Sequence, residues 1–156
     1  MRFAIHGRKV DENSLTCIQH LLTELDQRGA HVRISDTLYS LLQESSINQV
    51  PESIYPSRQG ILDEDVVISI GGDGTLLETV THVRKKETPI LGINIGRLGF
   101  LATVSQNQIT SAIDSLYQEK FSLDHRTLLE THYVDDIPPE LNFALNALTV
   151  IKKDYS

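Results

Sequence analysis

The sequence predicts an α/β fold: a mostly parallel sheet with helices on both faces, followed by the first strands of an incomplete β-rich domain. Up to about residue 119, short apolar stretches rich in β-branched residues alternate with longer stretches in which apolar side chains recur every three or four residues. After residue 121 only extended stretches follow, and no further helix is expected. The alternation predicts the parallel sheet, and the change of pattern predicts the second domain.

The expected elements follow one another along the chain. Strands are expected at residues 2–6, 31–34, 66–70 and 90–93. Helices are expected from a cap at Asn13 or Ser14 to Gly29, from a cap at Asp36 to about Gln43, from Leu76 to Lys86 after Thr75, and from the capping box of Ser105 and Gln108 to about Tyr117. Residues 44–65 are polar, contain two prolines and show no periodicity, so they are expected to form a loop.

A domain boundary is expected between residues 119 and 123. Residues 1–120 form the predicted α/β domain, and residues 121–156 begin the β-rich one. The second part holds two strand-like stretches, Arg126–Val134 and Leu141–Lys152, joined by a segment with two consecutive prolines. Two strands of this size joined by a turn predict a hairpin.

Composition excludes several classes of protein. The net charge is −7 and no long run of Lys or Arg occurs, which argues against binding of nucleic acid. No apolar run approaches membrane-spanning length, and the N-terminus is too short and polar for a signal peptide. A single cysteine, Cys17, forms no internal disulfide and fits a reducing compartment. We therefore expect a cytoplasmic protein that binds neither nucleic acid nor a membrane.

The most informative stretch is Val66–Thr75, VVISIGGDGT. Glycines after a buried strand allow the backbone to approach a ligand closely, and the start of the following helix attracts phosphate. A carboxylate in such a loop, Asp73, suggests a base or an acceptor for a hydroxyl beside the phosphate. Gly-Asp-Gly is also ordinary turn chemistry, and the loop fits neither the Walker nor the GxGxxG pattern.

A second glycine loop follows the next strand. Asn94 can donate and accept hydrogen bonds, Arg97 could meet a phosphate, and Phe100 could offer a flat surface to a ring. The simpler alternatives are turns, an exposed arginine and a core phenylalanine. Both loops are expected at the carboxyl edge of the sheet, where α/β folds bind ligands. Arg8 and Lys9 follow the first strand, so they either add positive charge at this edge or are merely solvated.

The histidines give no metal-binding pattern. None of the six forms an HxxxH or a Cys–His pair, so no protein-held metal site is expected. His82 lies on the helix after the first glycine loop and is interpreted as a surface or packing residue rather than a ligand.

Together, GGDGT at residues 71–75 and NxGxLGF at residues 94–100 resemble the NAD kinase family. GGDGT alone is shared with diacylglycerol and sphingosine kinases and is similar to the GGDGS of phosphofructokinases. The lipid kinases also carry a later P-x-G-T-x-N-D motif, which this sequence lacks. The resemblance implies a Rossmann-like first domain and an enzyme that moves the γ-phosphate of ATP, with its Mg²⁺, to the 2′-hydroxyl of the adenosine ribose of NAD.

The resemblance also assigns roles to residues. Asp73 would be the catalytic base, and the NAD site would comprise Asp73, Gly74, Asn94 and Phe100, the last two beside the adenine. The ATP phosphates would be lined by Gly71, Gly72, Gly74 and Thr75. In the second domain the family has an asparagine followed by an acid that holds a ribose of NAD. Asn146 fits this pattern, but Ala147 lacks the carboxylate.

Members of the family are nearly twice as long, so the sequence is interpreted as a truncated one. Residues 121–156 would begin the β-rich NAD-binding domain, the piece alone would be inactive, and the full-length protein would be a homo-oligomer. Two alternatives stay open: a lipid or sugar kinase of the wider GGDGT group, and a nucleotide-binding module without catalysis.

Overall fold

The computed structural model of the chain describes residues 1–45, 47, 50–96, 99–132, 138 and 142–147. The chain divides into two compact units, residues 1–123 and 124–156. The first is an α/β unit, and the second holds a small antiparallel pair of strands. Within the described part of the chain, no helix is both long and apolar enough to cross a membrane.

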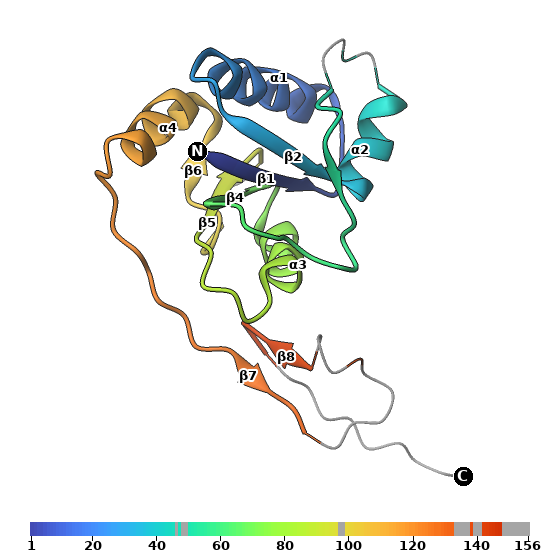
Figure 1. Cartoon of the computed structure of the whole chain (residues 1–156), viewed down its shortest axis with the longest axis vertical. Coiled ribbons are helices and arrows are strands. Elements are labelled where there is room, and N and C mark those ends of the chain that lie inside the picture. The colour runs from blue at the N-terminus through green and yellow to red at the C-terminus, as the bar shows by residue number, and fades with distance from the viewer. Residues whose placement is uncertain (46, 48–49, 97–98, 133–137, 139–141, 148–156) are drawn as a thin grey trace. The chain divides into compact units, whose positions relative to one another are not determined.

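The α/β unit is built on a six-stranded sheet (Figure 1). Its strands are β1 (Arg2–Gly7), β2 (His31–Ser35), β3 (Ile54–Tyr55), β4 (Val66–Ile70), β5 (Ile90–Asn94) and β6 (Val104–Ser105). They lie in the order β3-β2-β1-β4-β5-β6, and every neighbouring pair is parallel. The predicted parallel sheet is confirmed, and its order shows that β1 and β4 form the centre.

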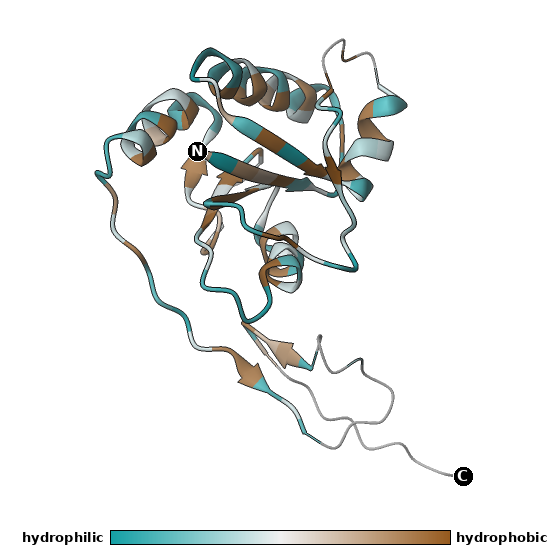
Figure 2. Cartoon of the chain, in the orientation of Figure 1, coloured by the Kyte–Doolittle hydropathy of each residue, from teal (hydrophilic) through white to brown (hydrophobic). Residues whose placement is uncertain are grey.

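Helices cover both faces of this sheet, as predicted. The helices are α1 (Glu12–Gln27), α2 (Asp36–Gln43), α3 (Asp73–Val83) and α4 (Ile109–Tyr117), with a 3₁₀ turn, Gln106–Gln108, before α4. The larger core joins α1, α2 and α4 to one face, where Phe3 and Ile5 of β1 lie. On the other face, Val83 of α3 packs with Ala4 and Val67. Figure 2 shows apolar residues concentrated in the strands and recurring along the helices.

The second unit contains β7 (Leu129–Glu130) and β8 (Phe143–Ala144), which pair antiparallel. In their register Leu129 lies opposite Ala144. This is the pairing that the predicted hairpin requires. The expected strands at 126–134 and 141–152 extend into residues 133–134, 141 and 148–152, which lie outside the described residues.

Several helix starts differ from the sequence-based expectation. Asp11, not Asn13 or Ser14, caps α1: its carboxylate accepts a hydrogen bond from the backbone N–H of Ser14 at 3.0 Å. Ser35, not Asp36, caps α2, and its hydroxyl accepts from the N–H of Leu38 at 3.1 Å. In both cases an earlier polar residue reaches the free N–H groups of the first turn, so the helix begins sooner.

The third helix also begins early, at Asp73 rather than Leu76, with Gly72 as its cap. The expected loop at residues 44–65 was partly wrong, because β3 adds a two-residue edge strand there. Other signals held. Gly29 follows the end of α1 with a φ of 63°, and Ser105 and Gln108 form the expected capping box.

Candidate functional site

The site lies where the order of the sheet reverses direction. From β1 the chain moves outward to β2 and β3, and from β4 it moves the other way to β5 and β6. Gly7 at the end of β1 pairs with Ile70 at the end of β4. Open α/β sheets bind ligands in the crevice at such a switch point, outside the carboxyl ends of the strands. The GGDGT segment begins directly after Ile70, so it occupies this position.

The turn into α3 requires glycine at its first position. Gly71 has a φ of 151°, and a Cβ there would lie 2.3 Å from Oγ1 of Thr75. Thr75 is buried, and its N–H donates to the carbonyl of Gly72 at 3.0 Å. Thr75 therefore shapes the loop from within, while Gly72 and Gly74 are exposed. The start of α3 presents backbone N–H groups at this edge, which favours an anion.

Arg8 adds positive charge beside the loop. Its Nη1 atom lies 4.0 Å from the position that a Cβ on Gly74 would take. Its Nε atom donates to Oε2 of Glu78 at 2.8 Å, which fixes the guanidinium over the first turns of α3. Lys9 instead pairs with Asp11 at 3.0 Å. Of the two cations that follow β1, Arg8 is the one placed against the glycine loop.

The carboxylate of Asp73 joins the two glycine loops. Its Oδ1 atom accepts hydrogen bonds from the N–H groups of Leu101 at 2.9 Å and Ala102 at 3.1 Å, and its Oδ2 atom accepts from Phe100 at 2.9 Å. These bonds, among which that from Ala102 has the largest effect, hold the pKa of Asp73 below its ordinary value of 3.8. The two loops therefore meet at one edge, as the strand order predicts, and Asp73 is ionised at neutral pH.

Gly99 and Asn94 shape the second loop. A Cβ on Gly99 would lie 2.2 Å from Oδ1 of Asp73, so only glycine permits the approach of the loop to this carboxylate. Asn94 is 4% exposed. Its Oδ1 atom accepts from the N–H of Gly96 at 2.8 Å, and its Nδ2 atom donates to the carbonyl of Ala102 at 3.3 Å. The side chain of Asn94 thus holds the loop that carries the donors to Asp73.

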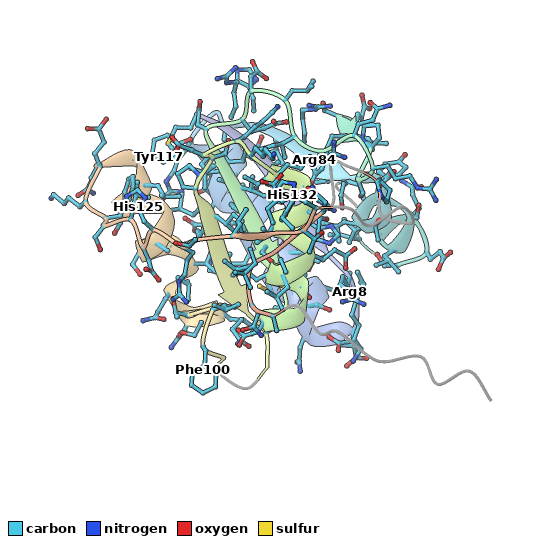
Figure 3. The ribbon with its side chains drawn as sticks, turned by 90° about the horizontal axis from the view of Figure 1, so that it is seen from below. Arg8, Arg84, Phe100, Tyr117, His125 and His132 are labelled. Carbon is cyan, nitrogen blue, oxygen red and sulfur yellow. The ribbon has the colours of Figure 1, made fainter. Side chains whose placement is uncertain are left out.

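The other predicted residues are placed as follows. Phe100 is 93% exposed and points away from the body of the α/β unit, so the core alternative is wrong (Figure 3). Arg97 lies outside the described residues. Asn146 and Ala147 are exposed and follow β8 in the second unit.

A cluster that the sequence analysis did not identify lies on the α3 face of the sheet. His6 of β1 approaches Glu78 and His82 of α3. His82 is buried rather than at the surface, so of its two interpretations the packing one holds. Burial lowers the pKa of His82 to about 4 and, together with the neighbouring His82, that of His6 to about 3. The sequence could have indicated that Glu78 and His82 lie on the same face of one helix, because they are four residues apart. No local pattern indicated that His6 joins them.

A parallel sheet of this order, with a glycine loop and a helix start at its switch point, defines an α/β protein of the Rossmann-like class. Residues 4–121 match the family described as the ATP-NAD kinase N-terminal domain, and the chain belongs to this family.

Relatives and a solved structure agree with this assignment. The chain is 34% identical to the NAD kinase of Cytophaga hutchinsonii, over 100% of this chain and 54% of that protein. It is 36% identical to the NAD kinase of Flavobacterium psychrophilum, over 99% of this chain and 53% of that protein. Its fold resembles that of yeast NADH kinase complexed with NADH, with a TM-score of 0.70 and 19% identity over 92% of this chain and 46% of the other. The chain thus spans about half the length of the relatives that it matches.

Proposed function

We propose that this chain provides the ATP-binding part and the catalytic carboxylate of an NAD kinase. The reaction transfers the γ-phosphate of ATP to the 2′-hydroxyl of the adenosine ribose of NAD. The observation that carries the proposal is the position of Asp73: an ionised carboxylate at the start of α3, at the switch point of the sheet, tied to the second loop by three N–H groups. The names of the two relatives support the choice of substrates.

The phosphates of ATP would lie against the loop at Gly71, Gly72 and Gly74. The start of α3 and the guanidinium of Arg8 supply favourable charge there. Thr75, being buried, would act by holding Gly71 in its conformation. A bound Mg²⁺ would neutralise charge on the phosphates. A carboxylate offers about four lone-pair sites, and three on Asp73 are already used, so we assign the ion to the nucleotide phosphates and to water.

The two oxygens of Asp73 differ in what they can still accept. Oδ1 accepts two backbone hydrogen bonds and Oδ2 accepts one. We assign to Oδ2 the hydrogen bond from the ribose 2′-hydroxyl. In the transfer, a bond forms between O2′ and the γ-phosphorus, the bond from that phosphorus to the bridging oxygen of ADP breaks, and the hydroxyl proton passes to Oδ2. The lowered pKa of Asp73 keeps the carboxylate ionised and able to take this proton, and its hydrogen bond also orients the hydroxyl in line with the phosphate.

The NAD site would extend along the second loop. The exposed ring of Phe100 offers a surface for the adenine, and Asn94, which is buried, would act by holding the loop that carries this ring. In the second unit, Asn146 would contact a ribose, with Ala147 in place of an acid. A cytoplasmic location, which the single cysteine supports, and a homo-oligomeric full-length protein complete the proposal.

Replacement of Asp73 tests the proposal. In a version of the protein with the length of its relatives, Asp73→Asn should lower the rate of NADP formation by about 100- to 10,000-fold, while the Kd for NAD changes only a few-fold. Asp36→Asn is a matched control, because Asp36 is the first residue of α2 as Asp73 is of α3. Its rate should equal that of the unaltered protein. Near-normal turnover by Asp73→Asn would reduce Asp73 to a loop residue. Phosphorylation of diacylglycerol but not of NAD would favour the lipid kinase alternative.

A further inference from the structure

Two histidines and a glutamate converge on the face of the sheet that α3 covers. His6 projects from β1, on the same side as Ala4, and Glu78 and His82 project from α3. One ligand-type atom from each of the three side chains lies within 4.8 Å of the others. Nε2 of His6 lies 3.5 Å from Oε1 of Glu78, and the centroids of the two imidazole rings are 4.3 Å apart. The 3.5 Å between Nε2 and Oε1 is close to the separation of two ligand atoms of one metal ion.

One atom of this cluster is buried without a partner. His6 is 0% and His82 is 2% exposed. Nδ1 of His6 bonds to the hydroxyl of Ser35 at 2.9 Å, but Nε2, which faces Glu78, has no hydrogen-bond partner. A buried polar atom normally has one, because its desolvation is otherwise uncompensated. Nε2 of His6 therefore directs an unused hydrogen-bonding position toward Glu78.

Each of the three side chains is also oriented by a second group. The hydroxyl of Ser35 contacts Nδ1 of His6, and that of Tyr55 contacts Nδ1 of His82 at 3.0 Å. Arg8 donates to Oε2 of Glu78 at 2.8 Å, which leaves Oε1 toward His6. If each ring proton lies on Nδ1 and is donated to the hydroxyl, both Nε2 atoms keep their lone pairs. Hydrogen bonds of this kind, behind histidine and carboxylate ligands, are usual in metal sites.

We propose that His6, Glu78 and His82 bind a divalent transition-metal ion of the Zn²⁺ type, with water in the fourth position. Two imidazole nitrogens and one carboxylate oxygen suit Zn²⁺, whereas Mg²⁺ and Ca²⁺ prefer oxygen ligands. The side chain of Glu78 is 34% exposed, which provides a path of entry.

The ion would link the central strand β1 to α3, the helix that begins at Asp73. It would therefore stabilise the packing of α3, and with it the glycine loop at the start of this helix. This role is separate from that of any Mg²⁺ that accompanies ATP. The site does not depend on kinase activity, because all of its ligands and their orienting groups lie within residues 6–82 of this chain.

Metal titration of the 156-residue chain tests the site. After treatment with a chelator, the chain should bind one Zn²⁺ by calorimetry, and one Co²⁺ with the strong visible absorption of tetrahedral coordination. Glu78→Gln, which keeps the size of the side chain, should weaken binding at least 10-fold, and Tyr55→Phe should weaken it about 10- to 100-fold. His20→Gln is the matched control: His20 and Glu24 form a histidine–glutamate pair on α1, beside Thr110 of α4, and its loss should leave binding unchanged.

The outcomes separate the site from adventitious binding. Stoichiometric binding that is weakened by Glu78→Gln and not by His20→Gln supports the site. Absence of stoichiometric Zn²⁺, equal affinity in Glu78→Gln, or loss of binding in His20→Gln overturns it. His82→Gln should also weaken binding, and because it alters a buried residue, its folding is checked by circular dichroism. If it does not fold, Glu78→Gln, at a half-buried position, decides the question.

Discussion

Replacement of Gly74 by alanine distinguishes a glycine that serves a ligand from one that serves the fold. Gly74 is the second residue of α3, its φ is not positive, and a Cβ there would meet nothing closer than Nη1 of Arg8 at 4.0 Å. The protein itself therefore has room for a methyl group. A glycine required by a turn would have a positive φ or a close neighbour, as Gly71 and Gly99 do.

The expected change in stability follows from this geometry. Alanine is favoured over glycine by about 1 kcal/mol in a helix interior, and we take about 0.5–1 kcal/mol for the first turn. At about 2–4 °C per kcal/mol for a chain of this size, Gly74→Ala should raise the Tm by about 1–4 °C. In a version of the protein with the length of its relatives, activity should change in the opposite direction. The added methyl group would lie between the loop and the phosphates, so kcat/KM for MgATP should fall by about 10-fold or more, which corresponds to about 1.4 kcal/mol.

Thermal unfolding followed by circular dichroism at 222 nm measures the first effect, because all the helices of the described residues belong to the α/β unit. The control is Gly92→Ala. A Cβ on Gly92 would lie 2.7 Å from Cδ1 of Leu76 and 2.8 Å from Cα of Ala102, so this change should overpack the core and cost about 1–3 kcal/mol. A Gly74→Ala protein that is destabilised like Gly92→Ala, or one with full activity, would refute the reasoning.

Three further predictions concern other positions. The pKa of Asp73 is depressed in the folded state, so the stabilisation from its ionised form should be complete above about pH 5 and be lost as the pH falls through its folded-state pKa. Urea unfolding from pH 2 to 6 measures the difference in free energy of unfolding between the unaltered chain and Asp73→Asn, which should shrink below about pH 3.8. A difference that grows there would contradict the assignment. In the longer version of the protein, Ala147→Glu should lower the Kd for NAD about 10- to 100-fold through a charge-assisted hydrogen bond to a ribose hydroxyl, and titration calorimetry that finds no tightening would mean that another group serves the ribose. Burial raises the pKa of Cys17 to about 11, so about 0.1% of this side chain is thiolate at pH 8. A disulfide reagent should therefore label Cys17 only after unfolding, and rapid labelling of the native chain would show that it is accessible.

The regular part of the fold could be predicted from the sequence because it depends on local patterns. Val66–Ile70 is apolar or small throughout, which is typical of a strand buried on both faces, and β4 is central and buried. The pattern failed for β3 and β6, which have two residues each. Two residues show no periodicity, and these strands exist only because β2 and β5 offer them hydrogen bonds.

The site could be predicted in position but not in detail. Each glycine-containing loop follows a strand of the parallel sheet, so both loops were expected at one edge, and the structure brings them together there. The sequence does not show that the carboxylate of Asp73 is held by N–H groups of residues 100–102, because that contact depends on the packing of two separate loops. His6 and His82 are 76 positions apart, and only the pairing of β1 within the sheet brings them together.

The order of the strands also has a consequence for how the chain acquires its structure during synthesis. Residues 2–55 hold β1, β2 and β3, which can pair as soon as they leave the ribosome. The other edge of β1 stays open until residues 66–70 dock on it, and the contact of Asp73 with the second loop needs residue 102. A half-made chain therefore exposes an unpaired central strand, a form prone to pairing with other chains, and has no phosphate loop. The ligand-binding edge of the α/β unit is therefore complete only after the two halves of the sheet have paired.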